Sequence, residues 1–82
     1  VNIQPTIYAL QIAAFQNYKD ADNIKAQLTL MGYTVKIIPT TSKNKILHRV
    51  IIGPFTNSAS VEKIQHQLHA QHFNSVILKM VS

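Results

Sequence analysis

The sequence of 82 residues predicts one α+β domain of the ferredoxin-like, ribonucleoprotein-like type, with element order βαββαβ, a four-stranded antiparallel sheet and two helices on one face. Two observations predict this fold. The chain divides into two similar halves, with corresponding positions 40 residues apart, and each half has the pattern strand, helix, strand. Because parallel crossovers are right-handed, two such units combine into one sheet whose centre holds the first and third strands.

The first half opens on an apolar run at residues 8–15, which has the length and composition of a strand. Asn17 then offers a side-chain oxygen that can cap a helix. We expect this helix at residues 18–31, ending before Gly32, because glycine takes the left-handed conformation common at helix ends. A second strand is expected at residues 33–39.

The second half repeats this order. An apolar run at residues 48–55 predicts the third strand, and Asn57 or Ser58 can cap the helix expected at residues 59–71. The fourth strand is expected at residues 74–81. Along the chain, each predicted helix therefore follows one strand of its half and precedes the other.

Both predicted helices carry an apolar stripe in the same register. Its positions are spaced i, i+3, i+7, as in an amphipathic helix that packs on a sheet. They are Ala21, Ile24 and Leu28 in the first helix and Val61, Ile64 and Leu68 in the second. The polar segment at residues 40–45, between the halves, is short enough for a hairpin-type connection.

Composition limits the classes of protein that the chain can represent. It has no cysteine, which excludes structural disulfides, thiolate catalysis and thiolate metal sites. The net charge of +5 weakly favours an anionic partner such as nucleic acid, membrane or an anionic polymer. The longest apolar run, residues 50–52, is far shorter than the roughly 20 residues of a membrane span. Because the chain starts at Val1 and not at Met, we expect a domain excised from a larger protein.

The alternation of side chains along a strand assigns residues to the two faces of the predicted sheet. The side chains expected under the helices are Leu10, Ile12, Val50 and Ile52. Those expected on the opposite face are Ile7, Ala9, Gln11 and Ala13 from the first strand and Leu47, Arg49, Ile51 and Gly53 from the third. The centre of that face therefore combines a glutamine, an arginine, aliphatic side chains and small residues.

Single-stranded RNA binding is one function that a sheet of this topology can perform. RNA-recognition modules stack bases on aromatic side chains of the two central strands, and their third strand carries an aromatic, glycine-rich consensus. Neither feature is present here, and Tyr8 falls on the core side of the first strand. Single-stranded nucleic-acid binding, which the topology and the positive charge favour, therefore stands as the alternative hypothesis.

Three segments carry a family resemblance over residues 8–80. They are Tyr8-x-Leu10-Gln11-x-Ala13-Ala14-Phe15, then Ala21 to Leu28 followed by Gly32-Tyr33, and then Arg49-Val50-x-Ile52-Gly53-Pro54-Phe55. In this order and spacing they resemble the SPOR (sporulation-related repeat) domain of bacterial cell-division proteins, cell-wall amidases and lytic transglycosylases. On this basis we expect a flexible linker at residues 1–6 and the SPOR domain at residues 7–82.

The resemblance implies binding to septal peptidoglycan whose glycan strands have lost their stem peptides. Gln11 matches the first-strand Gln of the family and can exchange hydrogen bonds with sugar hydroxyls and acetamides. Arg49 matches the third-strand Arg, which can engage the lactyl carboxylate of N-acetylmuramic acid. Ile51 and Ala13 would meet the apolar faces of the sugar rings.

Two further positions of the implied glycan site depart from the family pattern. Ala14 stands where many members carry Ser, so one hydroxyl contact is missing. Leu47 stands where some members carry an aromatic residue that can stack on a sugar. Both departures predict a weaker or a different hold on the glycan.

The resemblance also implies a cellular context. We expect a C-terminal domain of a larger protein, located in the periplasm or cell envelope, which targets its parent protein to the division septum. The parent protein is expected to be anchored in a membrane outside this segment. The domain itself is expected to be a monomer that binds denuded peptidoglycan glycan strands, without a cofactor, a metal or a nucleic-acid partner.

Catalysis is not predicted. The three acids, Asp20, Asp22 and Glu62, lie in or near helix starts, where negative charge complements the helix dipole. A glycoside hydrolase needs two carboxylates that face one cleft. The sequence also lacks a nucleophile elbow and a phosphate-binding glycine loop, so we expect that the domain is not an enzyme.

Three histidines near the end of the sequence are candidates for a metal site. His66, His69 and His72 are spaced by three residues, and three imidazoles at such a spacing can bind zinc. They fall largely off the buried stripe, however, among polar neighbours. A solvated face is therefore the interpretation that we adopt, and no metal site is predicted.

Overall fold

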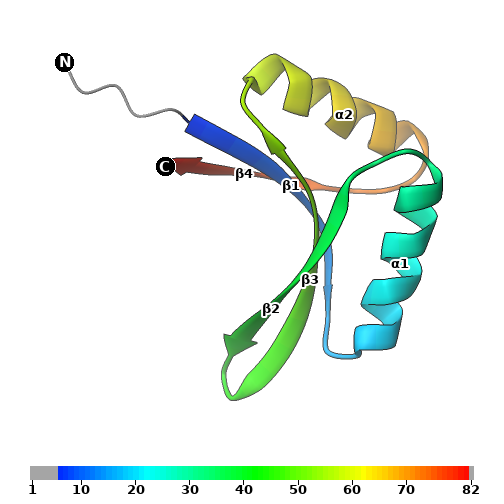
Figure 1. Cartoon of the computed structure of the whole chain (residues 1–82), viewed down its shortest axis with the longest axis vertical. Helices are drawn as coiled ribbons and strands as arrows, with labels where there is room; N and C mark the ends of the chain where they lie inside the picture. Colours follow the sequence, from blue (N-terminus) through cyan, green and yellow to red (C-terminus); the bar gives the residue numbers. More distant parts are fainter. Residues whose placement is uncertain (1–5, 82) are drawn as a thin grey trace.

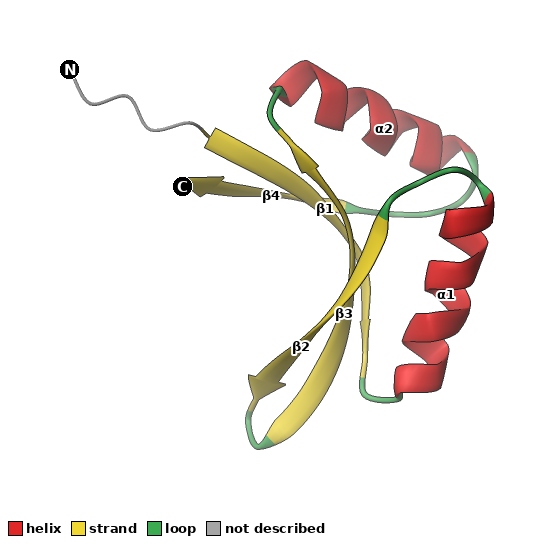
Figure 2. Cartoon of the chain, viewed as in Figure 1, coloured by secondary structure: helices red, strands yellow, loops and turns green. Residues whose placement is uncertain are grey.

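In the computed structural model, which describes residues 6–81, the chain forms six elements in the order βαββαβ (Figure 1). They are β1 (Thr6–Phe15), α1 (Tyr18–Leu30), β2 (Val35–Ser42), β3 (Lys45–Phe55), α2 (Ser58–Ala70) and β4 (Val76–Val81). The strands form one sheet in the order β2-β3-β1-β4, and all neighbours are antiparallel. Both helices cover the same face of the sheet (Figure 2). The predicted fold class and the predicted central strands are confirmed.

The first strand begins one residue before the predicted start of the domain. Thr6, the last residue of the predicted linker, is the first residue of β1 and pairs with Val81 of β4. The other linker positions, residues 1–5, lie outside the described residues, so their assignment to a linker stays a prediction.

The two helices begin in the same way and lie within one residue of their predicted bounds. The side chain of Asn17 caps α1 by accepting a backbone N–H at 2.8 Å. Asn57 caps α2 by accepting the backbone N–H groups of Ala59 at 2.7 Å and Ser60 at 3.3 Å. These bonds satisfy N–H groups that the first turn of a helix leaves without partners. Asn57, and not the alternative Ser58, is therefore the cap of α2.

A single core lies between the sheet and the helices. Leu10, Val50 and Ile52 of the central strands meet Leu28 of α1 and Leu68 of α2, and none of these five side chains is more than 2% exposed. The predicted inward positions of these strand and helix residues are confirmed. Complete burial of one such aliphatic side chain contributes roughly 1.5–3 kcal/mol, so aliphatic packing supplies the stability that a chain without disulfides needs.

The two halves are joined by a shorter turn than the sequence indicates. Residues 40–42 pair with residues 45–47, so the predicted connection shrinks to Lys43 and Asn44. Both turn residues have positive φ, 50° and 64°, as is required by two-residue turns that follow the twist of a hairpin. The strands β2 and β3 consequently extend well beyond the helices as a long hairpin (Figure 1).

Two irregularities interrupt the pairing of β1 with β3. The first is a β-bulge near Gly53, where β3 has one residue more than the facing part of β1. Gly53 has φ +144°, and a Cβ added there would lie 3.3 Å from the Cα of Ala9. Only glycine permits so close an approach with that backbone conformation. This bulge lies within β3, which continues to Phe55.

The second irregularity corrects the predicted faces of β1. One extra residue, Ile12, lies between the paired positions Gln11 and Ala13. Ala13 consequently pairs with Val50 of the core, on the helix side of the sheet, so the prediction that Ala13 faces outward is wrong. A bulge shifts the alternation by one residue, and Ala14 takes the outward position instead.

Candidate functional site

The face of the sheet that the helices leave uncovered is the candidate functional surface, here called the open face (Figure 2). Cross-strand pairing assigns its members, because directly paired residues lie on the same side of a sheet. They are Lys36, Ile38, Thr40 and Ser42 from β2; Lys45, Leu47, Arg49 and Ile51 from β3; Ile7, Ala9, Gln11 and Ala14 from β1; and Val76, Leu78 and Met80 from β4.

A hydrogen bond joins the two central strands across the open face. Arg49 Nε donates to Gln11 Oε1 at 3.0 Å, and both side chains are half-buried. This bond uses one of the five N–H donors of the guanidinium. The terminal N–H groups of Arg49 and the Nε2 group of Gln11 therefore keep their capacity to bind a ligand.

The open face is positively charged. The acids Asp20, Asp22 and Glu62 are all exposed residues of α1 and α2, in the layer on the other side of the sheet. The described residues of the open face therefore include three cations, Arg49, Lys36 and Lys45, and no carboxylate. Such a face attracts anionic groups, and an arginine binds a carboxylate through short, charge-assisted hydrogen bonds.

An apolar hollow of about 270 Å³ adjoins this pair on the open face. Ala9 and Ile51 form its deepest part, since they are only 4% and 7% exposed although they lie outside the core beneath the helices. Lys36, Ile38 and Met80 from the edge strands also line it. The open face thus combines an apolar depression with a positioned hydrogen-bonding pair and a positive charge.

Comparison with known protein families identifies the chain. The family model described as the SPOR domain matches residues 4–79. The chain belongs to the SPOR domain family. No curated protein matches it.

Solved structures with the same architecture include other SPOR domains. The SPOR domain of RlpA from Pseudomonas aeruginosa is 27% identical, with a TM-score of 0.79 over 87% of this chain and 96% of that chain. The peptidoglycan binding domain of the cell wall lytic enzyme CwlC from B. subtilis is 19% identical, with a TM-score of 0.72 over 98% and 96%. The Spor protein DedD is 20% identical, with a TM-score of 0.68 over 90% of this chain and 39% of that chain.

The SPOR domain brings together four of the six residues predicted to contact glycan. Gln11 and Ile51 face one another on the central strands, Arg49 bonds to Gln11, and Ala14 pairs directly with Arg49. Leu47 also lies on the open face, two residues further along β3 towards the hairpin. The sixth, Ala13, lies on the helix side and does not join them. A direct role of any of these residues in binding stays a prediction.

The apolar hollow of the SPOR domain includes residues that the sequence did not assign to the site. Lys36 pairs with Ile51 on the open face, but its residue type alone does not indicate a role in binding. Ile38 and Met80 lie on the edge strands β2 and β4, and their pairing with Arg49 and Ile7 places them on the open face. In β4 the run at residues 76–78 is apolar throughout, and only its pairing with β1 shows that Ile77 packs on the core.

The six aromatic residues of the SPOR domain lie away from the open face. Five of them pack against the core beneath the helices: Tyr8, Phe15, Tyr33, Phe55 and Phe73. The sixth, Tyr18 of α1, meets His48 edge to face, with ring centroids 5.3 Å apart. The central strands therefore offer no aromatic platform of the kind on which single-stranded RNA stacks.

The three histidines considered as metal ligands do not all lie on one helix. His66 and His69 belong to α2, whereas His72 lies beyond its end with φ +70°. Among residues 6–81 no three His, Asp or Glu side chains are grouped so that they could hold a metal ion together. Neither α1 nor α2 has the length and apolar character that crossing a membrane requires.

Proposed function

We propose that this SPOR domain is a non-catalytic module whose open face binds peptidoglycan, at glycan strands that have lost their stem peptides. The observation that carries the proposal is the hydrogen bond from Arg49 to Gln11 beside the apolar hollow, on a positively charged face. Membership of the SPOR family supports it, as does the fold shared with the peptidoglycan binding domain of CwlC.

A glycan strand carries three kinds of group that complement the open face. The C–H faces of its sugar rings pack on Ile51 and the rest of the apolar hollow. Its hydroxyl and acetamide groups exchange hydrogen bonds with the carboxamide of Gln11, and a lactyl carboxylate receives N–H groups of Arg49. Because the two polar side chains already hold each other in place, fewer rotamers are lost on binding.

The preference for strands without stem peptides follows from the chemistry of the lactyl group. A stem peptide is attached to this group through an amide, which removes the free carboxylate. Only a strand that has lost its peptides therefore presents the anion that Arg49 pairs with. The proposed specificity thus rests on one charge-assisted contact.

The distribution of acids supports binding and not catalysis. Hydrolysis of a glycosidic bond uses a pair of carboxylates on either side of the scissile bond. In this chain Asp20, Asp22 and Glu62 lie on the helical layer, whereas the proposed glycan lies on the open face. No pair of acids therefore reaches the proposed ligand.

In the cell, the proposed domain acts as a monomer at the C-terminal end of a larger protein, in the periplasm or cell envelope. It holds its parent protein at the division septum by binding denuded glycan there. The membrane anchor of the parent protein lies outside this segment.

Co-sedimentation with purified sacculi tests the proposed function. We expect the domain to pellet with sacculi, and more of it to pellet after an amidase has removed the stem peptides. Loss of a hydrogen bond to a charged group is worth about 1.5–3 kcal/mol, so Arg49→Ala should raise the Kd about 10- to 100-fold, and Gln11→Ala should raise it by a smaller factor. Equal binding by the wild type and both folded variants would overturn the proposal.

A matched variant separates a specific site from general charge attraction. Lys63→Ala removes one positive charge from the exposed side of α2 and should leave binding unchanged at the same salt concentration. Arg49→Lys keeps the charge but loses the planar fork of donors, so it should bind more weakly than the wild type and more tightly than Arg49→Ala. If Lys63→Ala and Arg49→Ala weaken binding equally, the proposed site is wrong.

The cellular part of the proposal has its own test. A fluorescent protein fused to this domain and exported to the bacterial periplasm should form a ring at the division site. The same fusion with Arg49→Ala should be spread along the envelope. A ring of equal intensity with both fusions would show that binding at the open face does not direct septal localisation.

A further inference from the structure

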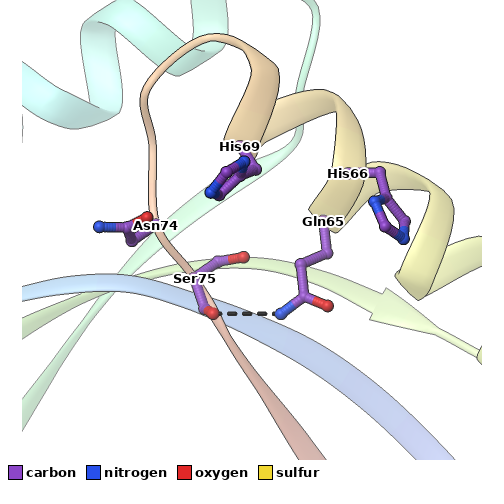
Figure 3. A pocket seen from close by; sticks show the side chains of 5 residues that line it. All are labelled: Gln65, His66, His69, Asn74 and Ser75. Carbon is purple, nitrogen blue, oxygen red and sulfur yellow. Dashed lines mark hydrogen bonds between the residues drawn. The ribbon is translucent and has the colours of Figure 1, made fainter.

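A second hollow, of about 320 Å³, lies between α2 and the segment that leads into β4 (Figure 3). Its lining residues are Gln65, His66, His69, Asn74 and Ser75. None of them belongs to the open face. The proposed glycan site therefore does not account for this hollow.

The residues that line this second hollow are of polar types without permanent charge. Its lining provides two carboxamides, one hydroxyl and two imidazoles, and it includes no Lys, Arg, Asp or Glu. Figure 3 shows the rings of His66 and His69 extending in different directions, so they do not converge on one point as metal ligands would. Groups that both donate and accept hydrogen bonds complement a neutral ligand with several hydroxyl or amide groups.

A hydroxyl without a partner lies at the base of the second hollow. The Oγ atom of Ser75 is buried and has no hydrogen-bond partner. The nearby carboxamide of Gln65 is occupied elsewhere, since its Nε2 donates to the backbone oxygen of Ser75 at 3.1 Å (Figure 3). A buried hydroxyl in this state lowers stability unless it acquires a partner.

The duplication shows that folding does not require this hydroxyl. The position 40 residues before Ser75 is Val35, which belongs to the core and is only 9% exposed. The fold thus accommodates an apolar side chain at this place in the first half. In the second half the same place carries a polar group with an unmet hydrogen bond, beside a hollow lined by polar groups.

We propose that the second hollow is a saccharide site that takes one neutral sugar unit with an acetamide group. The choice of an amino sugar rests on the proposed function, whereas the presence of a polar-ligand site does not. Asn74 and the two imidazoles bond to hydroxyls at the rim. The Gln65 carboxamide is held by one bond to a backbone oxygen and turns to bond to the sugar, which also supplies the missing partner of the Ser75 hydroxyl.

A second sugar site would change how the domain holds its polymer. Two weak sites on one rigid domain can engage two positions of a glycan network, and the second contact then occurs at a high effective concentration. The two sites differ in what they select. The open face prefers a carboxylate, whereas the second hollow accepts an uncharged sugar.

Titration of the ¹⁵N-labelled domain with N,N′-diacetylchitobiose, followed by NMR, tests this proposal. This disaccharide has acetamide groups and no carboxylate. We expect shifts of the side-chain amide signals of Gln65 and Asn74 and of the backbone signal of Ser75. These shifts should persist in Arg49→Ala, because that variant changes only the open face.

The variant Ser75→Val, which copies the first half of the chain, separates a binding role from a structural one. Its Tm should rise, because an unpaired buried hydroxyl is removed, while its Kd for the disaccharide should increase about tenfold or more. A merely structural serine would leave the disaccharide shifts as they are in the wild type, and that result would overturn the proposal.

The outcomes for the two sites are distinguishable. Shifts confined to open-face residues, or no shifts at all with millimolar disaccharide, would overturn the second site and leave the proposed function standing. Shifts at the second hollow in a domain that fails to pellet with amidase-treated sacculi would support the second site and overturn the proposed function.

Discussion

The two halves of the SPOR domain, β1-α1-β2 and β3-α2-β4, repeat the same packing. Each contains a helix of 13 residues between two strands. Leu28 and Leu68 occupy corresponding positions and are both fully buried. Each helix also ends in the same backbone bond, from Tyr33 N to Leu28 O at 3.1 Å and from Phe73 N to Leu68 O at 2.9 Å.

The halves differ where side chains are free of the core. Gln11 in β1 corresponds to Ile51 in β3, and Arg49 in β3 corresponds to Ala9 in β1. One half therefore supplies the amide and the other supplies the cation of the hydrogen-bonded pair on the open face. Position 75 is an exception, since Ser75 stands where the first half has the core residue Val35.

This comparison shows how a duplicated fold acquires a binding surface. Apart from the pair Val35 and Ser75, positions in the core keep their apolar character in both copies because a change in volume or polarity there costs stability. Positions outside the core are free to diverge, and the pair Gln11 and Arg49 exists only because the two copies became different. Four sets of substitutions test the comparison, in order of decreasing effect.

The largest effect should come from the leucines that the halves share. Leu28→Ala and Leu68→Ala should each lower the free energy of unfolding by about 2–5 kcal/mol, because each leaves a cavity in the core. Urea titration followed by circular dichroism measures both. Leu30→Ala, at a position 89% exposed, is the control and should change stability by less than about 0.5 kcal/mol. A difference of more than about 2 kcal/mol between the two core variants would show that the halves are not equivalent in packing.

The next effect concerns the glycine at the bulge of the second half, Gly53, where the first half has Ala13. Gly53→Ala should destabilise the domain by about 1–3 kcal/mol, since the new Cβ meets the backbone of β1 at 3.3 Å and φ is +144°. Gly32→Ala, where a Cβ meets no atom within 4 Å, should cost about 1 kcal/mol through its positive φ alone. Thermal unfolding compares the two. Equal losses would mean that close approach across the bulge contributes nothing.

The helix caps should show a smaller, unequal effect. Asn17→Ala and Asn57→Ala should each lower stability by about 0.5–2 kcal/mol. Asn57 accepts two backbone N–H groups and Asn17 accepts one, so the loss should be greater in the second half. Replacement of each by Asp, which keeps the accepting oxygen, should restore most of the stability; failure to do so would show that capping is not the cause.

The smallest effect should arise just after the helices, where both halves use a left-handed residue. Gly32 has φ +97°, and His72 takes the same place in the second half with φ +70°. His72→Gly should stabilise the domain by about 0.5 kcal/mol, since relief of the left-handed strain slightly exceeds the added entropy of the unfolded chain. The midpoint of urea unfolding measures this change. A lower midpoint would mean that the His72 side chain makes a stabilising contact.

The sequence by itself determined the parts of the SPOR domain that depend on local pattern. The 40-residue repeat, the apolar stripes and the asparagine caps predicted the element order and the helices to within one residue. Alternation before the bulge also placed Gln11 and Arg49 on the same face, as their hydrogen bond confirms. These predictions succeeded because they involve residues a few positions apart, or a repeat that is visible in the chain itself.

Only the tertiary structure decided the features that depend on pairing between distant segments. The extra residue Ile12 became apparent from the register of β1 against β3, and it moved Ala13 to the helix side and Ala14 to the open face. Pairing with β1 likewise sorted the uniformly apolar β4, and the fold brought Ser75 of the second half beneath Gln65. Alternation along one strand cannot reveal a bulge, because a bulge is defined by the residue that lies opposite, here Val50, 38 positions beyond Ile12 (50 − 12).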